Sequence, residues 1–219
     1  MTHGAGHGTG HDFDKAYWER HWEDRPGGPA AIAVDLPNPY LARELADLAP
    51  GTALDAGCGA GAGAVWLAEH GWQVTAADIS AEALARAADR AAASGAAADV
   101  RWVEADLSSW EPDTDFDLVM THYAHPAMAQ LDFYDRIAAW VAPGGTLLIV
   151  GHLHTHHAPE GGHDQPPAEA TATVTAVTAR LADDRWDVVT AEEQHRTVLV
   201  PDGPATALQD VVVRATRRS

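Results

Sequence analysis

A glycine-rich stretch with an acid in front of it is the part of the sequence most able to hold a ligand. Residues 52–63 read T-A-L-D-A-G-C-G-A-G-A-G, with Asp55 inside an apolar run and a glycine at every second position from Gly57. Glycine has no Cβ and tolerates positive φ, so such a turn between a strand and a helix lets the backbone approach a ligand closely. The N–H groups of the following helix then point at that ligand. The pattern predicts a cradle for a nucleotide-like molecule.

The spacing of the loop fits two kinds of ligand. Gly57, Gly59 and Ala62 satisfy the relaxed dinucleotide pattern, and Asp78 lies about twenty residues further on, where an acid would bind a ribose. Asp55 distinguishes the two, because a carboxylate there would repel a pyrophosphate and attract a cationic amino group. An amino acid joined to a nucleoside, which is the shape of S-adenosylmethionine, fits better. An NAD-dependent oxidoreductase remains the alternative.

Polar and histidine side chains follow two later apolar runs. They are Thr121, His122, Tyr123 and His125 after residues 116–120, and His152 and His154 after residues 146–150. In open α/β sheets ligands bind beyond the carboxyl ends of the strands, so these side chains would face a transferable group. Imidazole has an unperturbed pKa of about 6.5, so His122 and His125 are candidate general bases for a hydroxyl, amine or thiol. A histidine that only makes a hydrogen bond at a strand end is the alternative.

The segment 151–167 is rich in His, Gly and Pro. If the preceding strand continues, His152 and His154 point to the same side and could bind Zn²⁺ with a third ligand such as His122 or Asp164. A solvent-exposed loop explains the same residues, so we assign no metal site. The histidines also motivate a third possibility, a metal-binding or regulatory module without turnover.

The elements that would position these residues alternate between strand and helix. Strands are predicted at 52–56, 72–77, 100–103, 116–120 and 146–150, and helices at 38–50, 64–70, 80–94 and 128–141. Alternation of this kind predicts a parallel sheet. Nearer the end, the pattern predicts a helix at 168–184 and strands at 186–190, 196–200 and 208–215, with Asp202-Gly203 as a turn. The order therefore changes from strand–helix to strand–strand.

The chain divides into three predicted parts. Residues 1–11 form a His- and Gly-rich tail that has nothing to bury and is expected to be disordered. Residues 12–37 hold an aromatic helix and a linker, and residues 38–219 form one α/β domain. The helix carries aromatic rings on one face, which favours either packing on the core or a lid over the ligand. Tyr17 and Trp18 are the candidate substrate-contacting rings.

Composition disfavours several kinds of partner. Fourteen Lys and Arg against 32 Asp and Glu give a formal charge of −18, which would repel nucleic acid and an anionic membrane surface. No apolar run reaches the ~18 residues of a membrane helix, and the N-terminus does not resemble a signal peptide, so we expect a cytoplasmic protein. Cys58, the single cysteine, lies in the glycine loop, where a packing role is favoured over a nucleophilic one. Nothing indicates the oligomeric state.

Five segments in order resemble the motifs of the class I S-adenosylmethionine-dependent methyltransferase family. They are L-D-A-G-C-G-A-G, V-T-A-A-D-I-S, V-E-A-D-L, F-D-L-V-M and A-P-G-G-T-L-L-I-V. The resemblance extends from about residue 38 to the end. Within the family, the chain looks most like the small bacterial proteins grouped with thiopurine and tellurite-resistance methyltransferases.

The resemblance implies a Rossmann-like, seven-stranded, mostly parallel sheet with an antiparallel last strand and helices on both faces. It implies that Asp55, Gly57, Gly59 and Gly61 line the methionine part, that Asp78 takes the ribose hydroxyls, that Ile79 and Leu107 flank the adenine and that Asp106 contacts its amine. Cys58 and Thr121 complete the expected cofactor set.

The activity implied is direct displacement, which leaves S-adenosylhomocysteine and methylates O, N, S or a metalloid in a small molecule. The side chains expected to contact the small-molecule acceptor are Tyr17, Trp18, Tyr123, His152 and His154. The identity of the acceptor stays open.

Overall fold

The computed structural model describes residues 13–23, 36–153, 170–182, 184–198 and 206–219. The expectations for the tail at residues 1–11, for His154 and for the turn at Asp202-Gly203 fall outside these residues.

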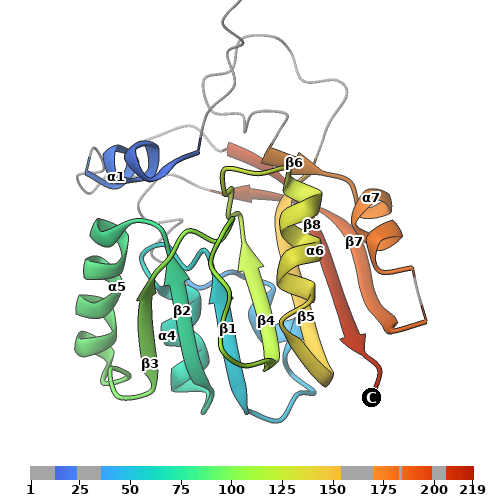
Figure 1. Ribbon diagram of the computed structural model, residues 1–219, viewed down its shortest axis with the longest axis horizontal. Helices are drawn as coiled ribbons and strands as arrows, with labels where there is room; N and C mark the ends of the chain where they lie inside the picture. Colours follow the sequence, from blue (N-terminus) through green and yellow to red (C-terminus); the bar gives the residue numbers. More distant parts are fainter. Residues whose placement is uncertain (1–12, 24–35, 154–169, 183, 199–205) are drawn as a thin grey trace, which may run out of the picture.

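An eight-stranded sheet forms the centre of the molecule (Figure 1). Its strands are β1 (Thr52–Ala56), β2 (Gln73–Asp78), β3 (Val100–Glu104), β4 (Phe116–His122), β5 (Val141–Leu153), β6 (Thr171–Ala172), β7 (Trp186–Val198) and β8 (Thr206–Arg217). Seven of them follow the order β3-β2-β1-β4-β5-β8-β7, and β6 pairs with β5 beside that path. Strands β1 to β5 pair in parallel, whereas β8 is antiparallel to both β5 and β7. The predicted fold class is confirmed.

Helices cover both faces of the sheet. They are α3 (Leu41–Glu44), α4 (Ala62–Glu69), α5 (Ala81–Ser94), α6 (Gln130–Ala138) and α7 (Val174–Arg180), with α1 (Lys15–Glu23) preceding them. Residues of α3, α4 and α5 join one apolar cluster, and residues of α6 and α7 join the other. Figure 1 shows α6 in front of the sheet and α4 behind it. Right-handed crossovers produce this arrangement, because β2 and β3 are added on one side of β1 while β4 and β5 are added on the other.

Local sequence sets the ends of α5. Ser80 begins it, since the Ser80 Oγ accepts a hydrogen bond from the amide of Ala83 at 3.1 Å. Gly95 ends it with a φ of 83°, a conformation that favours glycine. The predicted helix at residues 80–94 is therefore confirmed almost to the residue.

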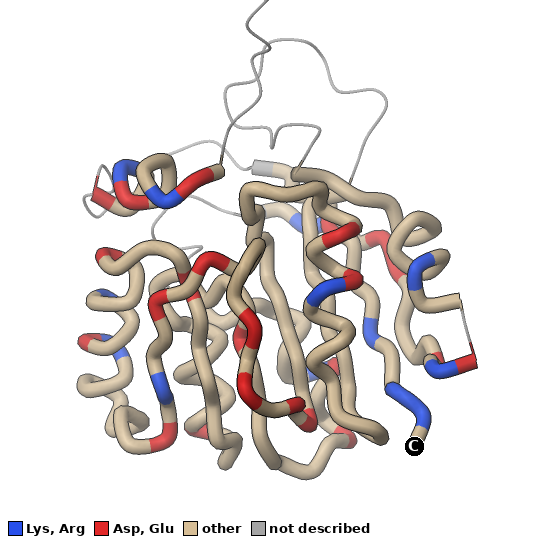
Figure 2. Tube along the Cα trace, viewed as in Figure 1, with Lys and Arg blue, Asp and Glu red and all other residues tan. Residues whose placement is uncertain are grey.

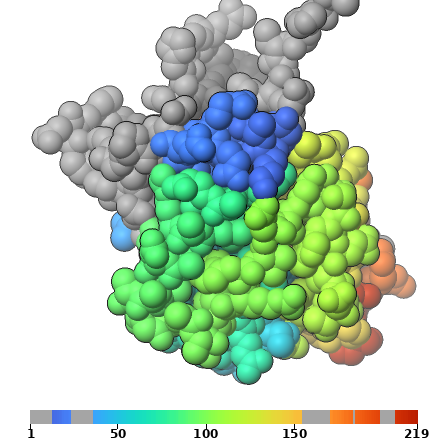
Figure 3. Space-filling model, turned by 60° about the vertical axis from the view of Figure 1, so that its left-hand side comes forward, coloured from blue at the N-terminus to red at the C-terminus, as the bar shows by residue number. Residues whose placement is uncertain are grey.

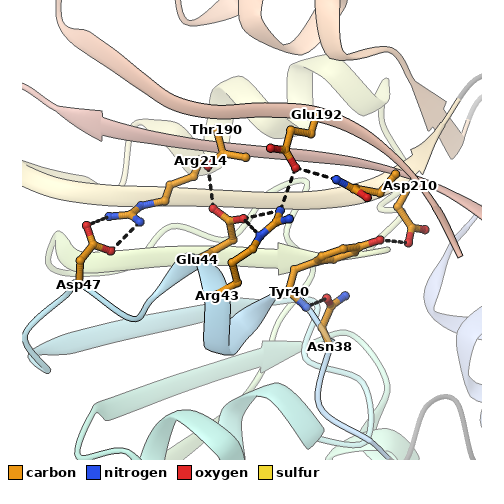
Figure 4. A network of polar contacts seen from close by, with 10 residues as sticks. Asn38, Tyr40, Arg43, Glu44, Asp47, Thr190, Glu192, Asp210 and Arg214 are labelled. Atoms are coloured by element: carbon orange, nitrogen blue, oxygen red, sulfur yellow. Dashed lines mark hydrogen bonds and ion pairs between the residues drawn. The ribbon is translucent and has the colours of Figure 1, made fainter.

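The predicted helix at residues 38–50 is wrong in length, because only the four residues of α3 are helical. Figure 4 shows the reason: polar side chains here reach across to β7 and β8. Glu44 accepts a hydrogen bond from Thr190 at 2.8 Å, and Asp47 accepts two from Arg214 at 2.7 and 2.9 Å. These contacts with strands far along the chain override the local helical pattern.

The C-terminal third also differs from its prediction. Within residues 168–184 a short strand, β6, precedes α7, so the expected long helix is wrong. The strands expected at 186–190 and 196–200 are one strand, β7, with a register shift between Val188 and Thr190. The polar run between them resembles a loop in sequence, but one face of an antiparallel pair tolerates polar side chains. Pro143-Gly144-Gly145 lies inside β5 and not before it.

No helix within the described ranges is long and apolar enough to cross a membrane. Acidic positions are spread over the chain and include several in the connection between β3 and β4 (Figure 2).

Candidate cofactor and acceptor site

The glycine loop leaves β1 and enters α4 with three residues of positive φ: Gly57 at 80°, Gly59 at 51° and Gly61 at 75°. A Cβ on Gly57 would lie only 2.2 Å from the Cβ of Ala124, in the loop after β4. The amides of Gly57 and Cys58 both donate to the carbonyl of Ala77, at 2.8 and 3.1 Å. The loop is thus held between the carboxyl ends of β2 and β4, as its glycine spacing predicts.

Asp55 lies in β1 with only 2% of its surface exposed. Burial, with the charge of Asp78 second, raises the pKa of Asp55 to about 7, against the opposing effect of a hydrogen bond from the amide of Ala64. A buried carboxyl that ionises with difficulty gains most from a cationic partner. Asp55 therefore suits a ligand with an amino group, as the sequence predicts.

Asp78, at the end of β2, is tied into the loop by both oxygens. Its Oδ2 accepts from the amide of Gly59 at 2.8 Å, and its Oδ1 accepts from the amide of Ser80 at 3.0 Å. Burial raises its pKa, although hydrogen bonds from Ser80, Gly59 and Ile79 oppose the shift. The carboxylate is preorganised at the place predicted for a ribose acid.

The ends of β2 and β3 meet beside Asp78, because the amide of Ala105 donates to the Asp78 carbonyl at 2.9 Å. Asp106 follows at once, and its Oδ1 accepts from the amide and the hydroxyl of Ser108 at 2.9 and 2.7 Å. Leu107 is buried, and Ile79 is half-buried. The residues expected around the adenine therefore come together at one edge of the sheet.

Two expected cofactor residues are engaged within the fold. The hydroxyl of Thr121, which is 1% exposed, donates to the carbonyl of Ala56 at 2.8 Å and joins β4 to β1. Cys58 is buried, and burial raises the pKa of its thiol well above the ordinary value. A thiol that resists ionisation fits the predicted packing role.

His122, at the end of β4, has a buried Nε2 without a hydrogen-bond partner among the described residues. Burial lowers its pKa to about 4, so the imidazole is neutral near pH 7. Buried polar atoms are nearly always paired in folded proteins, so an unpaired one at a strand end marks a place for a ligand or water.

His125 is held by a glutamine that fixes its tautomer. The Nε2 of Gln130 donates to the carbonyl of Ala124 at 3.0 Å, so its Oε1 accepts from the His125 Nδ1 at 3.1 Å. The Nδ1 of His125 therefore carries the proton, and its Nε2 keeps a lone pair. Burial lowers the pKa of His125, and the bond to Gln130 opposes this.

His152 and Tyr123 extend this group of rings. The ring of His152 lies 5.4 Å from that of His125 and 4.7 Å from that of Tyr123. Burial, followed by the charge of His125, lowers the pKa of His152 to about 4. Tyr123 adopts a φ of 56°, which is strained for a side chain of its size. The structure thus gathers the three predicted residues, with Tyr123 and His125 just after β4 and His152 near the end of β5.

A chain of polar contacts that the sequence does not predict lies behind Tyr123. Arg196 donates to the Tyr123 hydroxyl at 3.0 Å and to the Asp210 Oδ2 at 2.7 Å, and the Tyr40 hydroxyl donates to the same oxygen at 2.8 Å. Asp210 has no exposed side-chain surface, and within the described ranges its Oδ1 has no partner. The signal for this chain of contacts is the pairing of β8 with β5, which sets Asp210 opposite His152 and is not visible in the sequence.

The aromatic helix α1 lies against the loop after β4. The Nε1 of Trp18 donates to the carbonyl of His125 at 3.2 Å, and the ring of Phe13 lies 5.8 Å from that of His125. The ring of Tyr17 packs edge-on against that of Trp18 at 5.1 Å. Figure 3 shows α1 covering the top of the molecule above α5. The position fits the lid interpretation, while Trp22 packs on Ala60 and Ala83 in the way that the alternative expects.

No group of three or more His, Cys, Asp or Glu side chains that could hold a metal ion occurs in the part of the chain that the structure describes. His154 and the rest of the segment 154–169 lie outside it.

Comparison with known proteins places this site in a family context. The family model described as a methyltransferase domain matches residues 53–145. An uncharacterized methyltransferase of Mycobacterium tuberculosis is 40% identical over 99 residues, which are 44% of this chain and 48% of that protein. A probable thiol methyltransferase of Arabidopsis thaliana is 29% identical over 139 residues, covering 61% of this chain and 60% of that protein.

Among solved structures, the 1,6-didemethyltoxoflavin-N1-methyltransferase of Burkholderia thailandensis, with its substrate and S-adenosylhomocysteine bound, superposes with a TM-score of 0.64. The two are 22% identical, and the match covers 94% of this chain and 87% of that one. This similarity concerns the fold. The chain spans from a third to about half the length of the first curated relatives that it matches.

Proposed function

We propose that this chain, whose residues 53–145 form a methyltransferase domain of the class I S-adenosylmethionine-dependent family, transfers the methyl group of that cofactor to a small molecule. The observation that carries the proposal is the arrangement of Asp55, Asp78 and Asp106 around the glycine loop. Two of these acids lie in β1 and β2 and the third follows β3, so they meet at one edge of the sheet.

The residues present fit S-adenosylmethionine group by group. Asp55 is buried, and among the residues that the structure describes no cation pairs with it, which suits the α-amino group. Asp78 suits the ribose diol, and Ile79, Asp106 and Leu107 suit the adenine. The cofactor supplies a methyl group on a sulfonium, and bound S-adenosylhomocysteine in the Burkholderia structure supports the same use of this fold.

For the chemistry, positioning of the acceptor should provide most of the rate. If the acceptor atom carries a proton, that proton must leave as the new bond to carbon forms. The two candidates to receive it are the lone pair on the His125 Nε2 and the Nε2 of His122, which has no hydrogen-bond partner in the described part of the chain. Both imidazoles are neutral near pH 7, so both are available as bases.

A small acceptor is favoured by charge and by the character of the site. The chain carries a formal charge of −18, which disfavours nucleic acid. The rings of Tyr123 and His125 lie close to that of His152, and Tyr17 packs on Trp18 in α1. Such rings suit a flat organic molecule. The Arabidopsis relative is named for thiols and the Burkholderia enzyme for a ring nitrogen, so thiols and N-heterocycles are the first acceptors to test. A cytoplasmic location stays a prediction.

The test is methyl transfer from isotope-labelled S-adenosylmethionine to a panel of thiols, phenols, amines, N-heterocycles and tellurite, with RNA as a macromolecular arm. We expect labelled product and S-adenosylhomocysteine with at least one small acceptor. Transfer to RNA alone would contradict the small-molecule assignment, and cofactor binding without transfer to any acceptor would favour a non-catalytic module.

A further inference from the structure

We propose that Glu19 is a positioning residue for the cofactor, which acts from α1 on the turn that holds Asp78. The inference rests on the proposed function and adds a residue and a coupling to it. Glu19 lies outside the stretch that the family model matches, and it carries no motif of its own.

The carboxylate of Glu19 is inserted at the N-terminal end of α5. Its Oε1 accepts from the amide of Ala81 at 2.9 Å, and its Oε2 accepts from the Ser80 hydroxyl at 2.9 Å and from the amide of Glu82 at 3.3 Å. The first amides of a helix lack intrahelical partners and favour an anion. Burial works to raise the pKa of Glu19, but these three hydrogen bonds together with the charge of Lys15 outweigh it and leave the pKa below its ordinary value.

Ser80 connects this contact to the ribose acid. The residue is fully buried, its amide donates to the Asp78 Oδ1 at 3.0 Å, and its hydroxyl donates to Glu19. The Ser80 hydroxyl oxygen also accepts a hydrogen bond from the amide of Ala83, and this bond caps the start of α5. Only one residue therefore separates Glu19 from the carboxylate expected to hold the ribose.

Other contacts tie the rest of α1 across the site. Lys15 forms an ion pair with Glu104 at the end of β3, and Arg86 of α5 donates to the carbonyl of Trp22 at 2.7 Å. At the other side, Trp18 donates to the carbonyl of His125. In Figure 3 this helix lies on α5 and reaches the β4 side of the molecule. The helix thus contacts the cofactor edge and the acceptor edge together.

Two functional consequences follow. Trp22 of α1 packs on Ala60 of the glycine loop, and Glu19 holds the same helix to α5, so loss of Glu19 should speed dissociation of the cofactor. The same helix contacts both the cofactor edge and the acceptor edge. The ligand that binds first pays the entropy cost of ordering α1, and the second ligand does not pay it again. Cofactor and acceptor should therefore bind with positive coupling. Glu19 of α1 and Asp78 of β2 carry like charges and both contact Ser80, and the charge of Glu19 raises the pKa of Asp78. Packing alone would not require an acid at this position.

The experiment measures dissociation of S-adenosylhomocysteine by stopped-flow tryptophan fluorescence and its affinity by calorimetry. Glu19→Ala should dissociate about tenfold faster or more, equivalent to about 1.4 kcal/mol. Glu19→Gln keeps an acceptor oxygen, so its dissociation rate should lie between those of wild type and Glu19→Ala. Glu23→Gln, an exposed charge change in the same helix, is the matched control and should behave as wild type. In turnover, Glu19→Ala should raise the KM for S-adenosylmethionine without lowering kcat.

Hydrogen–deuterium exchange on the cofactor-free protein separates the possible failures. Glu19→Ala should speed exchange at the amides of Ala81 and Glu82, and Glu23→Gln should not. If wild type binds S-adenosylhomocysteine but Glu19→Ala dissociates at the wild-type rate, the inference is wrong while the proposed function stands. If wild type does not bind it at all, the function fails, and the exchange result alone then decides whether Glu19 clamps α5.

Discussion

At the scale of single residues, the expected cofactor site contains carboxylates that are costly to bury. Asp55 is the clearest, because it has no cationic partner among the described residues and its pKa is raised to about 7. A ligand with an amino group supplies the missing cation. The ligand-bound protein then holds Asp55 ionised, and therefore binds fewer protons than the free protein below about pH 7.

This difference predicts the pH dependence of cofactor affinity. The affinity for S-adenosylhomocysteine should rise by up to about tenfold per pH unit below about pH 7 and level off above it, since binding releases the proton of Asp55. Titrations in buffers of different ionisation enthalpy would count the released protons. Asp55→Asn should bind weakly with little pH dependence, whereas an unchanged slope in that variant would assign the proton to another group.

The histidines and Asp78 should separate in kinetics. Asp78→Ala should weaken cofactor binding, because the variant loses the expected ribose contact and frees the amides of Gly59 and Ser80. His122→Gln and His125→Gln should lower kcat for a proton-bearing acceptor by about 100-fold or more if the altered residue is the base, and should spare cofactor affinity. Equal losses of affinity in all three variants would contradict these roles.

At the scale of elements, the strand–helix alternation and the glycine loop could be read from the sequence because their signals are local. Glycine spacing, apolar runs and a serine cap act within a few residues, and β1 and α5 were placed to within a residue or so. The length of α3 could not be read, since its contact with Thr190 joins residues 146 positions apart. The continuity of β7 could not be read either, since it depends on pairing along its whole length with β8 and not on its own residues.

The glycine loop makes its own prediction. Gly57→Ala should destabilise the protein and abolish cofactor binding, because the new Cβ meets the Cβ of Ala124 and the φ of 80° disfavours a side chain. Adding Ala124→Gly removes the clash and leaves the backbone strain, worth about 1–2 kcal/mol. Urea denaturation of both proteins should therefore show partial rescue, and no rescue would mean that the clash is not the cause.

At the scale of the whole molecule, the site is completed by residues that the fold brings from the ends of the chain. α1 supplies Trp18 and Glu19, whereas β7 and β8 supply Arg196 and Asp210. Neither group carries a recognisable motif. Five ordered motifs predict the cofactor residues, and positions at strand ends predict Tyr123, His125 and His152. No local signal predicts Arg196 and Asp210, because their place depends on how β7 and β8 pair.

Tyr40 tests how far the segment before β1 supports this assembly. Tyr40→Phe removes one of the two donors to the buried Asp210 Oδ2, so it should lower the free energy of unfolding by about 1–2 kcal/mol. Asp187→Ala, which breaks an exposed ion pair with Arg218, is the control and should leave the unfolding midpoint unchanged. An equal effect of both changes would show that the buried contact contributes no more than a surface one.

The central claim is that the glycine loop and Asp78 hold S-adenosylmethionine, and calorimetric titration tests it most directly. We predict that S-adenosylhomocysteine binds wild type at micromolar concentrations and that Asp78→Ala weakens this binding by about tenfold or more. We also predict that wild type binds NADH more weakly than S-adenosylhomocysteine. Tighter binding of NADH than of S-adenosylhomocysteine, or no binding of S-adenosylhomocysteine at all, would contradict the account.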